Sequence, residues 1–302
     1  MSTIHHRAFT VRVRHRQECL RWSGGRARLT GGRCTTAPPP ATAASASTRF
    51  GFFPGLETPS DRSLTPRQRF DNIAARLGTP AVYRIYFDGL PPTTFRGSKA
   101  DLGVPVVLSF KADPARVASG DYDARLRSFF DSIPKDRLVW WSFFHEPEDE
   151  IEAGRFTAAQ YRAAWSHLLA VVPRRSTLRS TLILMRWDLE SRVRSVRSYV
   201  TPGIDVLAWD AYIRTWCPTI ADAYDKAARV SASYGMGFGV AETSVDDAVT
   251  NPPARTTVVR DVVGRGRADH AQFVIWFETN KSEGDYRLLP YPAAADLWNR
   301  LT

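Results

Sequence analysis

Cysteine is scarce in this chain, and long apolar runs are missing from it. The 302 residues include three cysteines, Cys19, Cys34 and Cys217, and none belongs to a C-x-x-C pair. Two of them precede residue 49, so the rest of the chain cannot form a disulfide bond within itself. No apolar run reaches the roughly 18 residues that a membrane-spanning helix requires. The sequence therefore predicts neither a disulfide framework nor a membrane span.

Acidic residues are almost missing from the first part of the chain. Residues 1–48 contain eight arginines, no lysine and one acidic residue, Glu18, so they carry +7 of the formal charge of +10. The Ala-, Pro- and Ser-rich segment 37–47 is typical of a linker. We expect residues 1–48 to form a disordered basic extension that binds no nucleic acid, although a nucleic-acid-binding arm is the alternative. No signal peptide is recognisable within them.

The other 254 residues are nearly neutral, with 33 basic and 30 acidic side chains. The whole chain is 43% hydrophobic and 12% aromatic, which is enough for a chain of this length to bury a substantial core. This composition excludes a disordered or fibrous body. We expect residues 49–302 to form one catalytic domain.

Short β-rich apolar segments alternate with longer amphipathic segments throughout this domain. The predicted strands are 50–54, 81–87, 104–110, 138–144, 181–186, 206–209, 237–241 and 272–277. The predicted helices are 66–77, 121–132, 157–172, 189–199, 220–234, 254–263 and 292–301. Strands joined by helices run parallel, and eight such units in about 250 residues predict an α/β fold, a (β/α)₈ TIM barrel. A doubly wound sheet is less favoured, because no Gly-rich turn follows the first strand.

Polar and aromatic residues gather where the predicted strands end. In a TIM barrel these ends meet at one mouth, where the chemistry takes place. Aromatic faces stack on sugar rings, and carboxylates bind hydroxyl groups, so this composition suits a carbohydrate. The candidate residues are Arg84, Lys111, His145, Glu146, Trp187, Asp188, Trp209, Asp210, Tyr212, Glu242 and Trp276.

Glu146 and Glu242 follow the fourth and seventh strands, so their carboxyl groups can meet across the mouth. Glycoside hydrolysis needs one protonated carboxyl group to protonate the leaving oxygen and one ionised carboxylate on the other side of the bond. Two like charges at short range raise the pKa of one group, which keeps it protonated near neutral pH. The distance between the two groups distinguishes a retaining from an inverting reaction.

These residues resemble those of the retaining glycoside hydrolases of clan A, and most closely family 26, the β-mannanase family. The match consists of His145-Glu146, Tyr212, Glu242 and Trp276. The resemblance implies that Glu146 is the acid/base and Glu242 the nucleophile, with Tyr212 hydrogen-bonded to it. It also implies that Trp276 forms the floor of the subsite beside the cleaved bond. The segment 147–152 differs from the family, which has Asn-Gly and a tryptophan-rich loop there.

Structural alternatives accompany these assignments. Trp276 and Tyr212 equally suit core packing, and Arg84, Lys111 and Asp188 equally suit buried ion pairs between strands. Glu278 competes with Glu146 and Glu242 for a catalytic role. The alternative function is a catalytically inactive barrel that binds carbohydrate or another protein. We expect no cofactor or metal, because the histidines other than His145 do not form a ligand set. The expected partner is a poly- or oligosaccharide, the expected state is a monomer, and the resemblance implies an extracellular location.

Overall fold

The computed structural model describes residues 47–55, 59–191, 195–214, 216–245, 254–281 and 284–302, and three strands before them. The chain divides into two compact units, Met1–Ala46 and Ser47–Thr302. This division lies close to the domain boundary that the change in charge predicts. None of the described helices is long and apolar enough to cross a membrane.

The first unit contains a small antiparallel sheet. Its strands are β1 (Phe9–Val13), β2 (Arg16–Ser23) and β3 (Arg26–Thr30), with β2 in the centre. The sequence predicts that residues 1–48 are disordered, whereas these three segments are described as paired strands. The remainder of residues 1–46 lies outside the described residues, so disorder stays a prediction for it.

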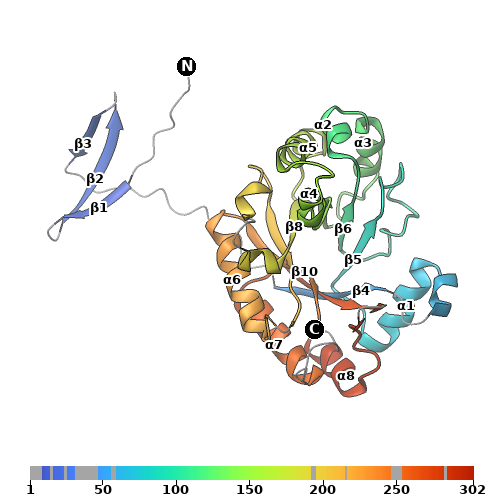
Figure 1. Ribbon diagram of the computed structural model, residues 1–302. Helices are drawn as coiled ribbons and strands as arrows, with labels where there is room; N and C mark the ends of the chain where they lie inside the picture. The colour runs from blue at the N-terminus through green and yellow to red at the C-terminus, as the bar shows by residue number, and fades with distance from the viewer. Residues whose placement is uncertain are drawn as a thin grey trace. The chain divides into compact units, whose positions relative to one another are not determined.

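Eight parallel strands form the closed barrel of the second unit (Figure 1). The final strand pairs with the first, which leaves no exposed sheet edge. All eight predicted strands are confirmed, and with them the (β/α)₈ fold. In order around the barrel the strands are β4 (Arg49–Pro54), β5 (Val82–Phe87), β6 (Val106–Phe110), β7 (Val139–Phe143), β8 (Leu178–Met185), β9 (Val206–Asp210), β10 (Gly237–Thr243) and β11 (Phe273–Glu278).

Helices pack around the outside of this barrel (Figure 1). They are α1 (Pro66–Leu77), α2 (Pro114–Ala118), α3 (Asp123–Asp131), α4 (Glu148–Glu152), α5 (Ala158–Val171), α6 (Ile220–Ser233), α7 (Arg255–Ala268) and α8 (Pro292–Leu301). Capping boxes at Thr65 and Thr157 begin α1 and α5, as Gln68 and Gln160 three residues later indicate. Short elements complete the unit: the 3-10 helix η1 (Pro59–Ser63) and the strands β12 (Asn280–Lys281) and β13 (Gly284–Asp285).

Six of the seven predicted helices are confirmed, and the prediction for 189–199 is wrong. The described part of this segment contains the end of the 3-10 helix η2 (Arg186–Glu190) and the 3-10 helix η3 (Val196–Ser198). The buried Arg186 guanidinium donates to the backbone carbonyls of Asp222 (2.7 Å) and Ala223 (3.0 Å) in α6. A polar anchor therefore holds η2 against α6, in place of the apolar stripe of an α-helix.

Side chains along each barrel strand alternate between the barrel interior and the surrounding helices. On β5, Val82 packs in the interior cluster, whereas Tyr83 and Ile85 belong to the larger cluster beneath the helices. Trp140 and Phe273 fill the interior with their rings 5.0 Å apart. This alternation decides which side chains at the strand ends can reach the mouth.

Candidate active site

The end of β7 positions His145 and Glu146 through an unusual backbone turn. Phe144 and Glu146 have positive φ angles of 48° and 51°, a region that costs residues other than glycine about 1–2 kcal/mol. The turn interrupts the alternation of the strand, so Phe144 packs outward against Phe156 with ring centroids 4.8 Å apart. His145 instead reaches the buried Ser109, whose Oγ lies 2.9 Å from the His145 Nδ1.

A β-bulge positions Glu242 at the end of β10. The pairing of β10 with β9 shifts register between Val240 and Glu242. One extra residue in a strand turns the following side chain to the other face. The bulge explains why both Ala241 and Glu242 face the interior, where Ala241 packs in the inner cluster and Glu242 meets Arg84.

Glu242 is held by hydrogen bonds to both of its oxygens. Arg84 Nε donates to Oε1 at 3.2 Å, and the Tyr212 hydroxyl donates to Oε2 at 2.6 Å. The Arg84 guanidinium is fully buried and also donates from Nη1 to Ser109 Oγ at 3.3 Å. Burial opposes its charge, but the carboxylates of Glu242 and Asp210 hold the Arg84 pKa above its usual value. The two donors thus fix the orientation of the Glu242 carboxyl group.

The carboxyl group of Glu146 lies in different surroundings. Burial and the charge of Glu242 raise the pKa of Glu146 to about 7. Burial, followed by the charges of Glu242 and Glu146, raises the pKa of Asp210 well above its usual range. Glu146 and Asp210 also hydrogen-bond each other, and two carboxyl groups can do so only when one carries a proton.

His145 is neutral in this surrounding. Burial lowers its pKa well below the usual value, and the positive charges of Arg84 and Lys111 lower it further. The ring of Tyr86 packs against the imidazole with centroids 5.3 Å apart. His145 therefore serves as a neutral hydrogen-bonding group. Lys111 is near enough for its positive charge to lower the pKa of His145, and its Nζ lies 5.0 Å from the centre of the Phe144 ring.

An open cavity of about 430 Å³ lies beside these carboxyl groups. We refer to it as the Glu146 cavity. It is lined by Glu146, Met185, Trp187, Asp210, Tyr212, Arg214 and Trp216. Glu146, Asp210 and Tyr212 thus line a space large enough for a sugar ring. Within the described residues, no group of three or more His, Cys, Asp or Glu side chains is placed to hold a metal ion.

Two predicted binding residues, Trp209 and Trp276, do not reach the cavity. The buried Trp209 indole donates to Ser231 Oγ in α6 at 3.0 Å. The buried Trp276 indole donates to the Tyr286 carbonyl at 2.9 Å and packs on Trp298 of α8. Both residues occupy outward positions of their strands, one residue away from Asp210 and Phe277, which face inward. The predicted sugar-binding floor at Trp276 is therefore a packing contact.

Two further carboxylates at strand ends lie apart from the cavity. Asp188 is buried, and burial together with the charge of Asp149 raises its pKa to about 7. Glu278, the competing carboxylate, accepts hydrogen bonds from the backbone amides of Leu288 (2.7 Å) and Leu289 (3.1 Å). This bonding makes Glu278 an anchor for the segment that leads into α8.

The structure also adds site residues that the sequence did not single out. Ser109 links Arg84 to His145, and Tyr86 covers the imidazole. Tyr86 lies on β5 two residues from Arg84, and Ser109 lies on β6 two residues from Lys111. Because side chains two residues apart on a strand share a face, this spacing is the signal that identifies both residues. Met185 lines the cavity from the end of β8, and Arg214 and Trp216 line it from the segment after β9, where strand alternation gives no signal.

Replacing Arg84 with methionine should lower the free energy of unfolding by about 3–5 kcal/mol at pH 7, because it leaves the Glu242 carboxylate buried without its cation. Urea denaturation measures this loss. The matched control is Arg116→Met, which breaks the exposed ion pair with Asp121 and should leave the urea midpoint unchanged. Equal midpoints for the Arg84 variant and the wild type would contradict the assigned role of Arg84.

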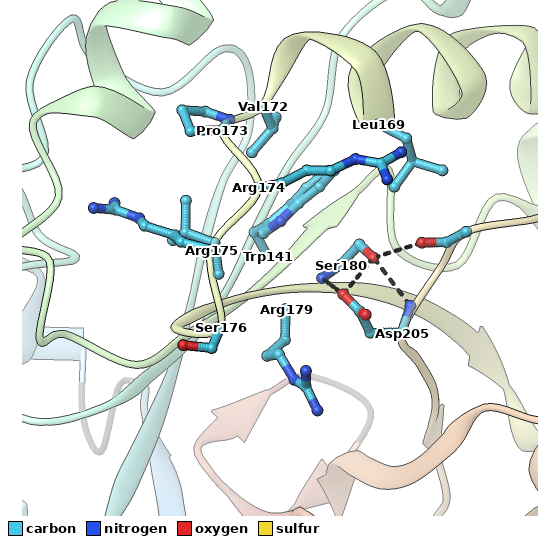
Figure 2. Close-up of a pocket in the computed structure, with 12 residues that line it drawn as sticks. Trp141, Leu169, Val172, Pro173, Arg174, Arg175, Ser176, Arg179, Ser180 and Asp205 are labelled. Atoms are coloured by element: carbon cyan, nitrogen blue, oxygen red, sulfur yellow. Dashed lines mark hydrogen bonds between the residues drawn. The ribbon is translucent and has the colours of Figure 1, made fainter. Parts of the chain in front are cut away.

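A separate pocket of about 370 Å³ lies where β8 begins (Figure 2). Arg174, Arg175 and Arg179 line it, and Ser180 donates from its amide and its hydroxyl to the Asp205 carboxylate, both at 2.9 Å. It therefore lies at the opposite end of the barrel from Glu146 and Glu242. In TIM-barrel enzymes the chemistry takes place where strands end, so we assign this pocket no catalytic role.

Several solved structures that are similar to this chain in fold are β-mannanases. The GH26 β-mannanase from Bacteroides ovatus matches with a TM-score of 0.52 and 14% identity, over 84% of this chain and 88% of that one. A β-mannanase from a symbiotic protist of the termite Reticulitermes speratus has a TM-score of 0.53 and 13% identity, over 85% and 87%. In fold, this chain resembles the β-mannanases. The resemblance to family 26 that the motifs indicate is thus confirmed at the level of the fold.

The Cellulomonas fimi endo-β-1,4-mannanase matches with a TM-score of 0.53 and 15% identity, over 85% of this chain and 70% of that chain. A GH113 β-1,4-mannanase matches with a TM-score of 0.52 and 10% identity, over 85% and 100%. The sequence matches no protein-family model, and no match to a curated protein is found. At such identities the similarity concerns the fold, so the chemistry depends on the residues of this chain.

Proposed function

We propose that this protein is a retaining glycoside hydrolase that cleaves β-linked polysaccharides, with β-mannan or a related β-glycan as substrate. One observation carries the proposal: two glutamates at the ends of β7 and β10 lie in different surroundings. Arg84 and Tyr212 donate to Glu242, whereas the pKa of Glu146 is raised to about 7 by burial and by the charge of Glu242. Glycoside hydrolysis requires one protonated and one ionised carboxyl group, and these different surroundings support such a pair.

The proposed reaction takes place in two steps. A Glu242 oxygen attacks the anomeric carbon and forms a glycosyl ester, while the bond to the leaving oxygen breaks and that oxygen takes the Glu146 proton. Glu146 then accepts a proton from water, which attacks the anomeric carbon and releases Glu242. Arg84 and Tyr212 orient Glu242, and Asp210 hydrogen-bonds the Glu146 carboxyl group.

A screen of polysaccharides tests this function directly. We expect reducing ends to appear with a β-1,4-mannan or a related β-glycan, and proton NMR of the first product to show the β-anomer. If the α-anomer is the first product, the reaction inverts the configuration and does not proceed by double displacement. Binding of glycans without the release of reducing ends would instead favour the inactive, carbohydrate-binding barrel.

The value of kcat/KM should fall as the pH rises through about 7. Glu146 acts as an acid only while it holds its proton, and burial together with the Glu242 charge raises its pKa to about 7. An ordinary glutamate, with a pKa near 4.3, would already be ionised there. The test is a pH profile of kcat/KM. A basic limb that lies about two units lower would contradict the protonated state of Glu146.

A further inference from the structure

Trp187 and Trp216 stand beside the Glu146 cavity and bound a second space. Trp187 belongs to η2, directly after β8. Trp216 lies between Arg214 and Cys217, whose backbones pair through hydrogen bonds of 3.0 and 2.9 Å. The Trp216 side chain is 50% exposed, more than any other large apolar side chain in the part of the chain that the structure describes. An exposed indole at the rim of a cleft indicates a binding surface.

The second space, which we call the outer cavity, has a volume of about 540 Å³. It is lined by Trp187, Glu190, Ser191 and Trp216. Both tryptophans also line the Glu146 cavity, so the two cavities adjoin and lead from the catalytic carboxyl groups to the surface. Trp187 Nε1 donates to Met185 Sδ at 2.9 Å, which orients its indole between the two spaces.

The chemistry of this lining suits a pyranose ring. Indole faces pack against the C–H faces of a sugar, and the Glu190 carboxylate can accept from sugar hydroxyl groups. Arg186 Nη1 (2.9 Å) and Lys226 Nζ (3.1 Å) hold that carboxylate in place. The carboxyl groups of Glu146, Asp210 and Glu190 along this path disfavour a phosphate-bearing ligand.

We infer that Trp187 and Trp216 bind a sugar unit of the substrate on the leaving-group side of the cleaved bond. The inference rests on the proposed function, and its direction follows from the acid. Of the two catalytic glutamates, only Glu146 lines the cavity that connects to the outer one. Glu146 gives its proton to the leaving oxygen, so a chain that runs past Glu146 toward the tryptophans is the departing part of the substrate.

Replacing Trp216 with alanine should change the preference for substrate length. The probes are β-1,4-mannohexaose and cellohexaose, which can extend past Glu146, and the 4-nitrophenyl β-glycosides of the corresponding disaccharides, whose leaving group is a small ring. We expect the ratio of kcat/KM on the hexasaccharide to kcat/KM on the nitrophenyl glycoside to fall about tenfold. Trp216→Phe should restore most of this ratio, because the phenyl ring keeps a stacking face.

Tyr234→Ala is the matched control. Tyr234 is an exposed aromatic residue that ends α6 and lies near the start of β10, away from the carboxyl groups, so the ratio should not change. An unchanged ratio in Trp216→Ala, or an equal fall for both substrates, overturns the inference.

A binding measurement separates this inference from the proposed function. If the wild-type protein hydrolyses none of the probes, the proposed function fails. Quenching of tryptophan fluorescence by the hexasaccharides, lost in Trp216→Ala, would still support the sugar site. Absence of both hydrolysis and quenching overturns both proposals.

Discussion

Replacing Glu242 with glutamine should lower kcat by roughly 10⁴-fold or more, because an amide cannot form the glycosyl ester. Glutamine has nearly the same shape, and it keeps an oxygen that can accept from Arg84 or from Tyr212. We therefore expect the variant to fold. Release of reducing sugar measures the loss of turnover, and circular dichroism with thermal unfolding verifies the fold.

Asp88→Asn is the control for this experiment. Asp88 follows β5 at the same end of the barrel, and its side chain is exposed. Removing this charge should leave kcat within about twofold of the wild type, since surface substitutions away from special features have small effects. Turnover near the wild-type value in a folded Glu242→Gln protein would remove Glu242 from the mechanism.

Replacing Glu146 with glutamine should reduce kcat/KM on a polysaccharide by about 10²–10⁴-fold, which is the usual contribution of a general acid. The amide has no proton to give to the leaving oxygen. A 2,4-dinitrophenyl glycoside needs no such proton, so its first step should stay fast and the glycosyl-enzyme should accumulate. Azide should then raise the turnover, because it attacks without a general base. The measurement is a burst of dinitrophenolate followed by a rate that depends on azide.

The same substitution should change how stability depends on pH. The pKa of Glu146 is raised to about 7 in the folded protein, above its value in the unfolded chain. Glu146 therefore contributes fully to the free energy of unfolding at pH values below the unfolded-state pKa, and this contribution is lost as the pH rises through about 7. Glutamine stays neutral, so the variant should be more stable than the wild type at about pH 8, with no such gain at about pH 4. Equal effects at both pH values, or a polysaccharide activity that does not change, would contradict a protonated Glu146.

The barrel was largely predictable because its signals are local. Apolar runs of four to seven residues, separated by amphipathic segments, identify all eight strands. The capping boxes at Thr65 and Thr157 identify the beginnings of α1 and α5. The segment 189–199 was assigned wrongly because Arg186 anchors it through carbonyl groups of α6, and such distant partners leave no local pattern.

The positions of Glu146 and Glu242 were predictable from topology, whereas their surroundings were not. Glu146 and Glu242 follow strands that a closed eight-strand barrel brings to one mouth. Trp209 and Trp276 are equally close to strand ends, yet both point toward the helices. Successive side chains of a strand point to opposite faces, and one bulged residue reverses this order, so proximity to a strand end does not determine the direction of a side chain.

The sequence by itself determined the barrel, the change of charge near residue 48 and the two glutamates, because periodicity, composition and strand order are properties of the chain. Only the tertiary structure decided which side chains meet. The bulge in β10 turns Glu242 to Arg84, and the positive-φ turn after β7 brings His145 to Ser109. The raised pKa of Glu146 likewise depends on burial and on a charge contributed by a distant strand.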